Sequence, residues 1–139
     1  MTEEDLDAVR RVYDEWGAGY WSRKFDFYDD AMEWGWSDEF PGLGGVYHDP
    51  AERNRRVQEW LRGWDDWRCE AEELIVHGDQ VVALTRYWGR GRGSGVSVDT
   101  KGAHVWTLRD GKVIRLVIFA TRERALAEVG LAPDREPPE

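Results

Sequence analysis

The segment 102–116 constrains the fold more than any other part of the chain, because it combines a turn signal with two alternating apolar strands. The dipeptide Asp110-Gly111 is typical of β-hairpin turns. A three-residue loop that begins at Arg109, with the glycine left-handed, predicts that Leu108 pairs with Lys112. Side chains alternate between the two faces of a strand, so one face of the hairpin should carry His104, Trp106, Leu108, Ile114, Leu116 and Ile118. The single polar side chain of that face is the histidine.

The residues before this hairpin predict helices. Residues 3–17 have apolar side chains at three- and four-residue spacing, which indicates an amphipathic helix. A second, short helix is predicted over 20–28. A third should begin at Pro50, after the cap Asp49, and end near Trp64. Its buried stripe would consist of Val57, Trp60, Leu61 and Trp64.

Strand signals dominate the second half of the chain. A strand is predicted at 32–36, before a loop over 37–45 that is rich in turn-forming residues. Four further strands are predicted at 70–76, 81–92, 96–108 and 113–120. A short helix from Thr121 to Leu126 should follow them. Helices followed by a meander of antiparallel strands predict an α+β fold in which the helices cover one face of the sheet.

Length and charge limit the number of domains and the kinds of partner. The 139 residues fit one domain, which we place at 1–131, with a proline-rich tail at 132–139 that we expect to be disordered. The 28 acidic and 19 basic residues give a net charge of −9, which disfavours nucleic acid and anionic membranes as partners. The acidic start and the lack of a long apolar run predict a cytoplasmic protein. Cys69, the only cysteine, offers no disulfide and no zinc cluster.

The chain has nine tryptophans and only four phenylalanines. Large aromatic rings can fill the core of a small domain and a subunit interface. They can equally line a pocket for a small molecule, and the two interpretations are compatible. The candidate pocket residues are Trp16, Trp34, Trp36, Trp60, Trp106, Leu116 and Ile118.

A set of short motifs extends over nearly the whole chain except its tail. They are Val9-Arg-Arg-Val-Tyr13, Phe27-Tyr-Asp-Asp30, the loop from Glu39 to Tyr47, Glu73-Leu-Ile75 before Gly78-Asp79, the glycine run 89–95 and the hairpin. Together they resemble SnoaL-like proteins of the nuclear-transport-factor-2-like superfamily. The resemblance implies a cone-shaped, curved antiparallel sheet wrapped around the N-terminal helices, a cavity beneath them, and commonly a dimer. It does not imply one function, because the superfamily contains isomerases, polyketide cyclases, epoxide hydrolases, dehydratases and binding domains.

The catalytic residues of these relatives are only partly kept. The polyketide cyclases carry a histidine on the first strand of the hairpin and an acid/base aspartate on the second. Here the histidine is kept as His104, and Ile118 stands in the place of the aspartate. The ketosteroid isomerases use an aspartate base with a tyrosine and a protonated aspartate. Those positions correspond to Gly35, Val12 and His104, with Tyr13 next to the tyrosine position.

His104, Tyr13 and Asp38 are therefore the candidate catalytic residues. An imidazole titrates near neutrality and can act as a general base or donate a hydrogen bond to an enolate oxygen. Burial would instead keep the ring neutral, and a core histidine bonded to a tyrosine or a backbone group is the alternative interpretation. Tyr13 or Asp38 would assist, although acids such as Asp38 and Glu39 are often solvated loop residues. The three scattered histidines predict no metal site, and we expect no cofactor.

Three functions remain open. The first is a cofactor-independent isomerase, cyclase or dehydratase that acts on a small hydrophobic carbonyl or hydroxyl compound. The second is a non-catalytic domain that binds a hydrophobic ligand, and the third is a dimeric scaffold with a filled barrel. A homodimer is predicted because the other face of the hairpin is apolar too and needs a cover, through Val105, Val113, Val117 and Phe119.

Overall fold

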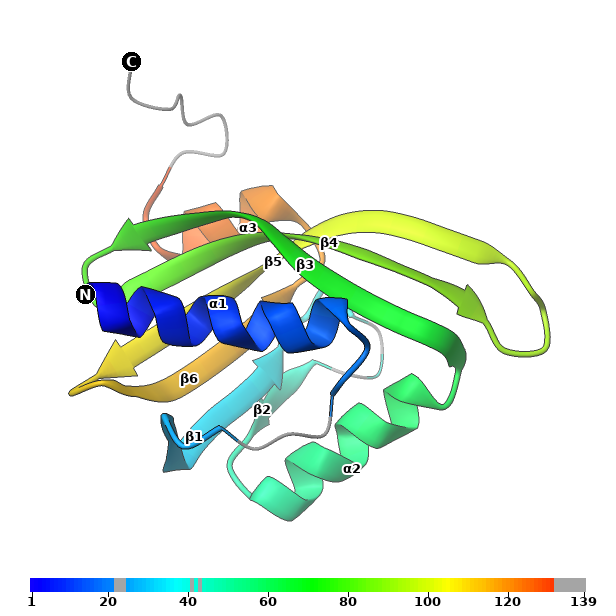
Figure 1. Cartoon of the computed structure of the whole chain (residues 1–139), viewed down its shortest axis with the longest axis horizontal. Helices are drawn as coiled ribbons and strands as arrows, with labels where there is room; N and C mark the ends of the chain where they lie inside the picture. Colours follow the sequence, from blue (N-terminus) through cyan, green and yellow to red (C-terminus); the bar gives the residue numbers. More distant parts are fainter. Residues whose placement is uncertain (22–24, 41, 43, 132–139) are drawn as a thin grey trace.

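The computed structural model describes residues 1–21, 25–40, 42 and 44–131, so the predicted tail at 132–139 lies outside the described residues. It contains three helices and six strands within this part of the chain (Figure 1). The helices are α1 (Glu3–Gly17), α2 (Pro50–Leu61) and α3 (Arg122–Glu128). The strands are β1 (Tyr28–Trp36), β2 (Gly45–Tyr47), β3 (Trp64–His77), β4 (Gln80–Gly91), β5 (Ser97–Arg109) and β6 (Lys112–Phe119).

The strands form a single sheet in the order β2-β1-β6-β5-β4-β3. The four long strands β3 to β6 make the predicted antiparallel meander. The expectation of an antiparallel sheet throughout was wrong, because β1 runs parallel to β6. The whole meander separates these two strands in sequence, and a parallel pair requires such a long connection. The predicted α+β, nuclear-transport-factor-2-like class is confirmed.

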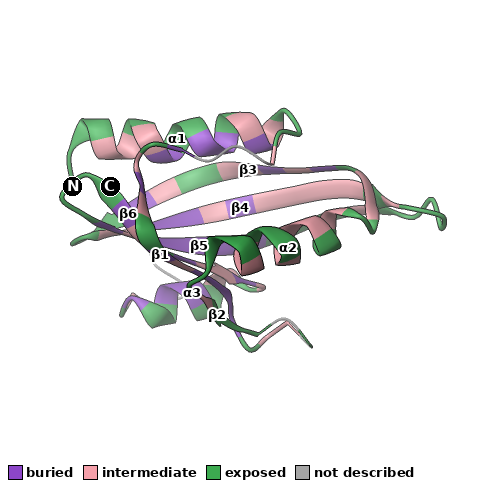
Figure 2. Ribbon diagram, turned by 90° about the horizontal axis from the view of Figure 1, so that it is seen from below, coloured by how far each residue is buried: buried purple, intermediate pink, exposed green. Residues whose placement is uncertain are grey.

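The sheet has an apolar core on each face (Figure 2). On the inner face α1 contributes Val9, Val12, Tyr13 and Trp16, which pack against side chains of β1, β5 and β6. On the outer face α3 places Ala125 and Leu126 against side chains such as Val82, Val105 and Phe119. The helices were expected on one face only, whereas α3 covers the other. The outer apolar face, which was the reason to predict a homodimer, is thus covered within the same chain, and the dimer stays a prediction.

Several boundaries differ from those predicted from sequence. The described residues of the segment 20–28 are not helical, and residues 22–24 lie outside the described part. Helix α2 begins at Pro50 with Asp49 as its cap, as predicted, but it ends at Leu61, and Trp64 opens β3. None of its side chains is fully buried, so the predicted buried stripe is wrong. Among the described helices none is long and apolar enough to cross a membrane.

The turn between β5 and β6 is one residue shorter than predicted. Arg109 pairs with Lys112, and Leu108 pairs with Val113. Asp110 and Gly111 have φ angles of 53° and 77°, so both central residues of this two-residue turn are left-handed, as in a type I′ hairpin. A register shift next to Leu108 then brings Val113, instead of Ile114, into the inner core.

We expect Gly111→Ala to lower the free energy of unfolding by about 1–2 kcal/mol, because an L side chain is strained in the left-handed region. A Cβ at Gly111 would meet only Asp5 Oδ1, at 4.0 Å, so the cost is one of backbone conformation. The control is Gly63→Ala, whose Cβ would make an ordinary contact of 3.5 Å with the Trp60 carbonyl. Urea unfolding curves that shift equally for both variants would contradict this interpretation.

Candidate functional site: an aromatic cavity with a buried histidine

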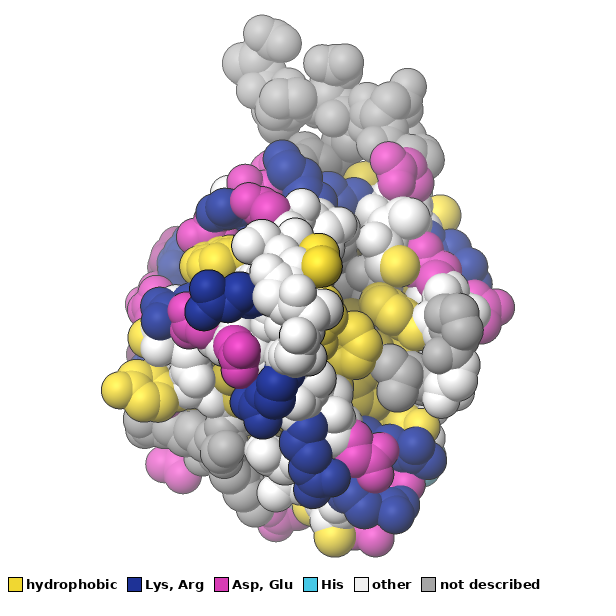
Figure 3. Space-filling model, turned by 90° about the vertical axis from the view of Figure 1, so that its right-hand side faces the viewer, with side chains coloured by type: hydrophobic (Ala, Val, Ile, Leu, Met, Phe, Trp, Pro, Cys, Tyr) yellow, Lys and Arg dark blue, Asp and Glu magenta, His cyan; other side chains and the backbone are white. Residues whose placement is uncertain are grey.

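A cavity of about 270 Å³ lies between the inner face of the sheet and the helices α1 and α2. This volume lies just below the usual range for ligand pockets, roughly 300–1,000 Å³. Seventeen residues line it: Trp16, Trp21, Trp36, Phe40, Val57, Trp60, Leu61, Trp64, Trp67, Tyr87, Val98, Thr100, Lys101, His104, Ile118, Phe119 and Ala120. Six of the nine tryptophans are among them. In Figure 3, which views the end of the molecule with the β4–β5 connection, hydrophobic side chains gather in a hollow surrounded by charged side chains.

The structure separates the predicted pocket residues into two groups. Trp16, Trp36, Trp60 and Ile118 line the cavity together with His104. Trp34, Trp106 and Leu116 do not line it, because they are packed in the inner core. Sequence reasoning missed the lining residues Trp67 and Tyr87. The inward face of β4 carries every second residue, Val81, Ala83, Thr85 and Tyr87, and this alternation is the pattern that could have indicated the tyrosine.

His104 is held at both ring nitrogens by tyrosines. The Tyr13 hydroxyl, on α1, lies 2.6 Å from Nδ1, and the Tyr87 hydroxyl, on β4, is hydrogen-bonded to Nε2. The Trp106 indole Nε1–H, on β5, donates to the Tyr13 hydroxyl oxygen at 2.7 Å. Two strands and a helix therefore meet at one imidazole, which is 1% exposed.

A glycine allows Tyr87 to reach the histidine. A Cβ on Gly102 would lie 3.0 Å from Cε2 of the Tyr87 ring and 2.9 Å from the Phe119 carbonyl oxygen. Both contacts are tighter than a side chain tolerates, and one of them is to backbone. The missing side chain at this point of β5 thus leaves the space that the Tyr87 ring occupies, which is a common use of glycine within a strand.

Burial sets the protonation states of this cluster. It lowers the pKa of His104 to about 3, because the charged imidazolium would lose its hydration. It also raises the pKa of Tyr13 and of Tyr87 well above their ordinary values. At neutral pH all three groups are uncharged, and each nitrogen of His104 is already in a hydrogen bond. This state is the one required of a structural hydrogen-bonding histidine, and it is poorly suited to a general base, whose pKa should lie near the working pH.

The acidic candidates lie away from the cavity. Asp38 is exposed and forms an ion pair of 3.0 Å with Arg124, so the position predicted for a catalytic helper is a surface site. Glu39 accepts hydrogen bonds from the Ser37 hydroxyl at 2.6 Å, the Ala120 N–H at 3.0 Å and the Thr121 hydroxyl at 2.8 Å. Burial raises the pKa of Glu39, but these hydrogen bonds outweigh it and keep the pKa below its ordinary value. This carboxylate fastens the loop that carries the lining residue Phe40.

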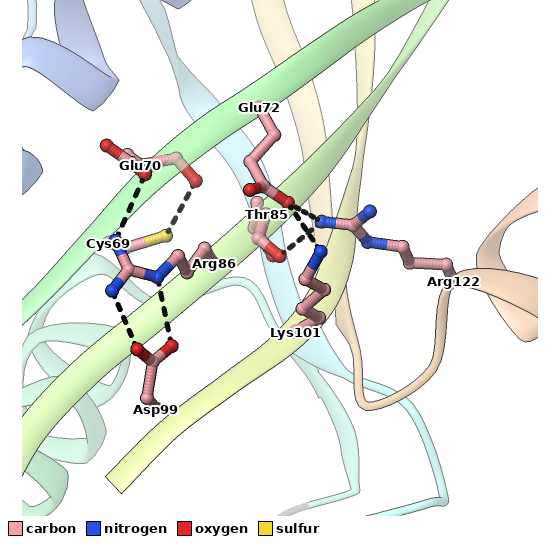
Figure 4. A network of polar contacts seen from close by, with 8 residues as sticks. All are labelled: Cys69, Glu70, Glu72, Thr85, Arg86, Asp99, Lys101 and Arg122. Carbon is pink, nitrogen blue, oxygen red and sulfur yellow. Dashed lines mark hydrogen bonds and ion pairs between the residues drawn. The ribbon is translucent and has the colours of Figure 1, made fainter.

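A charged network on β3, β4 and β5 supports the site from outside (Figure 4). Arg86 donates to Asp99 through two nitrogens, at 2.9 and 2.7 Å, and contacts Glu70. Arg122, which pairs with Glu72, also donates to the carbonyl oxygens of Thr85 and Gly102. Arg122 thereby ties α3 to the strand segments next to Tyr87. In the described part of the chain no group of three or more His, Cys, Asp or Glu side chains could hold a metal ion.

Tyr13→Phe should lower the free energy of unfolding by about 1–3 kcal/mol, because it leaves the Trp106 N–H and the His104 Nδ1 buried without a partner. Tyr20→Phe removes the same hydroxyl from a side chain that is 67% exposed and should change little. Chemical denaturation of the two variants measures the difference. Equal stability would mean that the buried hydrogen bonds carry no net free energy.

His104 should make stability depend on pH. The unfolded chain takes up a proton at this histidine near its ordinary pKa of 6.5, whereas the folded chain does so only near pH 3. Between these values the unfolded state binds more protons, so stability falls as the pH falls, by roughly 1 kcal/mol per pH unit. We expect the free energy of unfolding of His104→Gln to depend less on pH, between pH 6.5 and 5, than that of the wild type. Urea unfolding measured over this pH range would refute the assignment to His104 if the stabilities of the two proteins fell equally with pH.

The model of the SnoaL-like domain family matches residues 9–116, well over half of the chain. No curated protein matches the sequence. Solved structures share the fold at low sequence identity, and three of them are given as examples.

An NTF2-like protein of unknown function from Burkholderia pseudomallei is 18% identical, with a TM-score of 0.74, over 93% of this chain and 99% of its own. TerC, co-crystallised with polyporic acid, is 21% identical, with a TM-score of 0.73, over 91% and 98%. A protein with a ketosteroid isomerase-like fold from Catenulispora acidiphila, in complex with trimethylamine, is 13% identical, with a TM-score of 0.63, over 99% and 100%. With the curved sheet, the cavity beneath α1 and the matching family model, the chain belongs to the SnoaL-like domain family of the NTF2-like superfamily.

Proposed function

We propose that this chain binds a small hydrophobic molecule in the aromatic cavity and holds one oxygen atom of that molecule through the Tyr87–His104 pair. The observation that carries the proposal is the composition of the lining. Aromatic and aliphatic side chains surround a few polar groups, and Tyr87 and His104 are adjacent among them. An apolar cavity with a small number of convergent polar groups is the usual form of a small-molecule site.

The partly buried apolar side chains of α2 support a ligand site. Val57 and Leu61 are half-buried and Trp60 is 36% exposed, yet all three line the cavity. Such side chains gain most from contact with a guest, because burial of apolar surface stabilises a complex by roughly 25 cal/mol per Å². A hydrophobic ligand would cover the apolar surface of α2 that the protein itself leaves partly exposed.

Binding without turnover fits the chemistry of the site better than acid/base catalysis. His104 is neutral and occupied at both nitrogens, and Ile118 stands where the related cyclases have their aspartate. No carboxylate is among the described residues that line the cavity. In this proposal His104 and Tyr13 are positioning residues, and neither carries a proton to or from the ligand. Two proteins of the same fold support the proposal, because TerC was co-crystallised with polyporic acid and the Catenulispora protein is in complex with trimethylamine.

The test uses 1-tetralone, a compact bicyclic ketone, as the probe. We expect saturable quenching of tryptophan fluorescence, a matching isotherm by calorimetry, and recovery of unchanged ketone after long incubation. Trp60→Ala should weaken the affinity roughly tenfold, because it removes a large ring from the lining. The matched control is Trp88→Ala, because Trp88 is packed under Arg86 and does not line the cavity.

Two outcomes would contradict the proposal. Conversion of the probe to a new compound would favour an isomerase, cyclase or dehydratase. Absence of binding by 1-tetralone and by its hydrocarbon analogue tetralin, with no small molecule retained in native mass spectra of fresh protein, would favour the dimeric scaffold. The same spectra count the subunits and so test the predicted homodimer.

A further inference from the structure

We propose that the direction of the buried hydrogen bonds makes the Tyr87 hydroxyl a donor into the cavity, so that the site selects ligands with an acceptor oxygen such as a ketone or quinone carbonyl. This inference rests on the proposed function, because it names the chemical class that the same cavity takes. It concerns four residues on three elements: Tyr13 of α1, Tyr87 of β4, and His104 and Trp106 of β5.

Trp106 determines the direction of the first hydrogen bond. An indole N–H can donate but not accept, so Trp106 must donate to the Tyr13 hydroxyl oxygen, 2.7 Å away. The Tyr13 side chain is buried, and its own hydroxyl proton needs an acceptor. Among the described residues the remaining partner of this hydroxyl is Nδ1 of His104, at 2.6 Å. Tyr13 therefore donates and Nδ1 accepts.

The imidazole ring of His104 carries the same direction of hydrogen-bond donation from Tyr13 to Tyr87. The ring is neutral, because burial lowers the pKa of His104 to about 3. A neutral imidazole with an accepting Nδ1 carries its proton on Nε2, which is bonded to the Tyr87 hydroxyl. His104 thus donates to the Tyr87 oxygen. The opposite tautomer would leave the Tyr13 hydroxyl proton without an acceptor in the core, at a cost of about 1–3 kcal/mol.

Tyr87 ends the chain of hydrogen bonds at the cavity. Its oxygen already accepts from His104, so its own proton is free to be donated, and its ring lines the cavity. The Thr85 hydroxyl, on the same strand, acts in the direction that lowers the Tyr87 pKa, as a donor to the phenolic oxygen does, and so leaves the Tyr87 proton available. Hydrogen bonds in a chain polarise one another, which strengthens the terminal donor. A ligand with a carbonyl oxygen satisfies this donor, whereas a hydrocarbon of the same shape leaves it unpaired.

The experiment compares 1-tetralone with tetralin, which has the same bicyclic skeleton without the carbonyl. In the wild-type protein we expect calorimetry to give three- to tenfold tighter binding of the ketone, as for one hydrogen bond in a buried site. Tyr87→Phe should reduce this preference to less than twofold while it keeps the affinity for tetralin, which also shows that the variant is folded. The infrared carbonyl band of bound 1-tetralone should lie at a lower wavenumber in the wild type than in Tyr87→Phe.

Thr100→Val is the matched control, because Thr100 is the other hydroxyl-bearing side chain among the described residues that line the cavity, and it lies outside the hydrogen-bonded Tyr13–His104–Tyr87 cluster. The preference for the ketone should survive in this variant. Loss of the preference in Thr100→Val, with its retention in Tyr87→Phe, would move the donor to Thr100 and overturn the proposal. Equal binding of ketone and hydrocarbon by the wild type would also overturn it and leave only the binding of a hydrophobic molecule in the cavity. Failure of both probes to bind, with no small molecule retained in native mass spectra, would reject the function itself.

Discussion

The hydrogen-bonded burial of His104 is the interaction on which the rest of the site depends. A histidine that is 1% exposed is stable only if both ring nitrogens have partners, since an unpaired polar group in the core is costly. Tyr13 and Tyr87 supply those partners from a helix and from a neighbouring strand. The requirement therefore fixes how α1 lies over the sheet. It also places the polar groups of Tyr87 and His104 at one end of a cavity that is otherwise mostly aromatic.

The same constraint is the reason why the proposed function is binding and not acid/base catalysis. A proton-transfer catalyst needs a group whose pKa lies near the working pH. Burial moves the pKa of His104 far below that range, and the neighbouring position on β6 is Ile118. What remains is a neutral set of hydrogen-bonding groups. Such a set suits the proposed recognition of a ligand oxygen, and α2 contributes partly exposed apolar side chains to the wall of the cavity.

Much of the fold could be predicted because it follows from local patterns. The two-residue alternation of the strands, the caps Asp49 and Thr121, and the Asp-Gly turn each depend on short-range sterics and hydrogen bonds. The errors arose where distant segments compete for the same surface. The parallel pairing of β1 with β6 and the cover of the outer face by α3 depend on contacts between residues far apart in sequence. No local pattern encodes them.

The sequence by itself determined the meander, the inward orientation of His104 and the excess of tryptophan that makes an aromatic cavity possible. The tertiary structure decided which rings line that cavity and which fill the core, since Trp36 and Trp106 both lie on inward-facing strand positions but differ in what packs over them. It also decided the partners of His104. Tyr13 and Tyr87 lie 91 and 17 residues away in sequence, and only the packing of α1 and the space above Gly102 bring their hydroxyls to one ring.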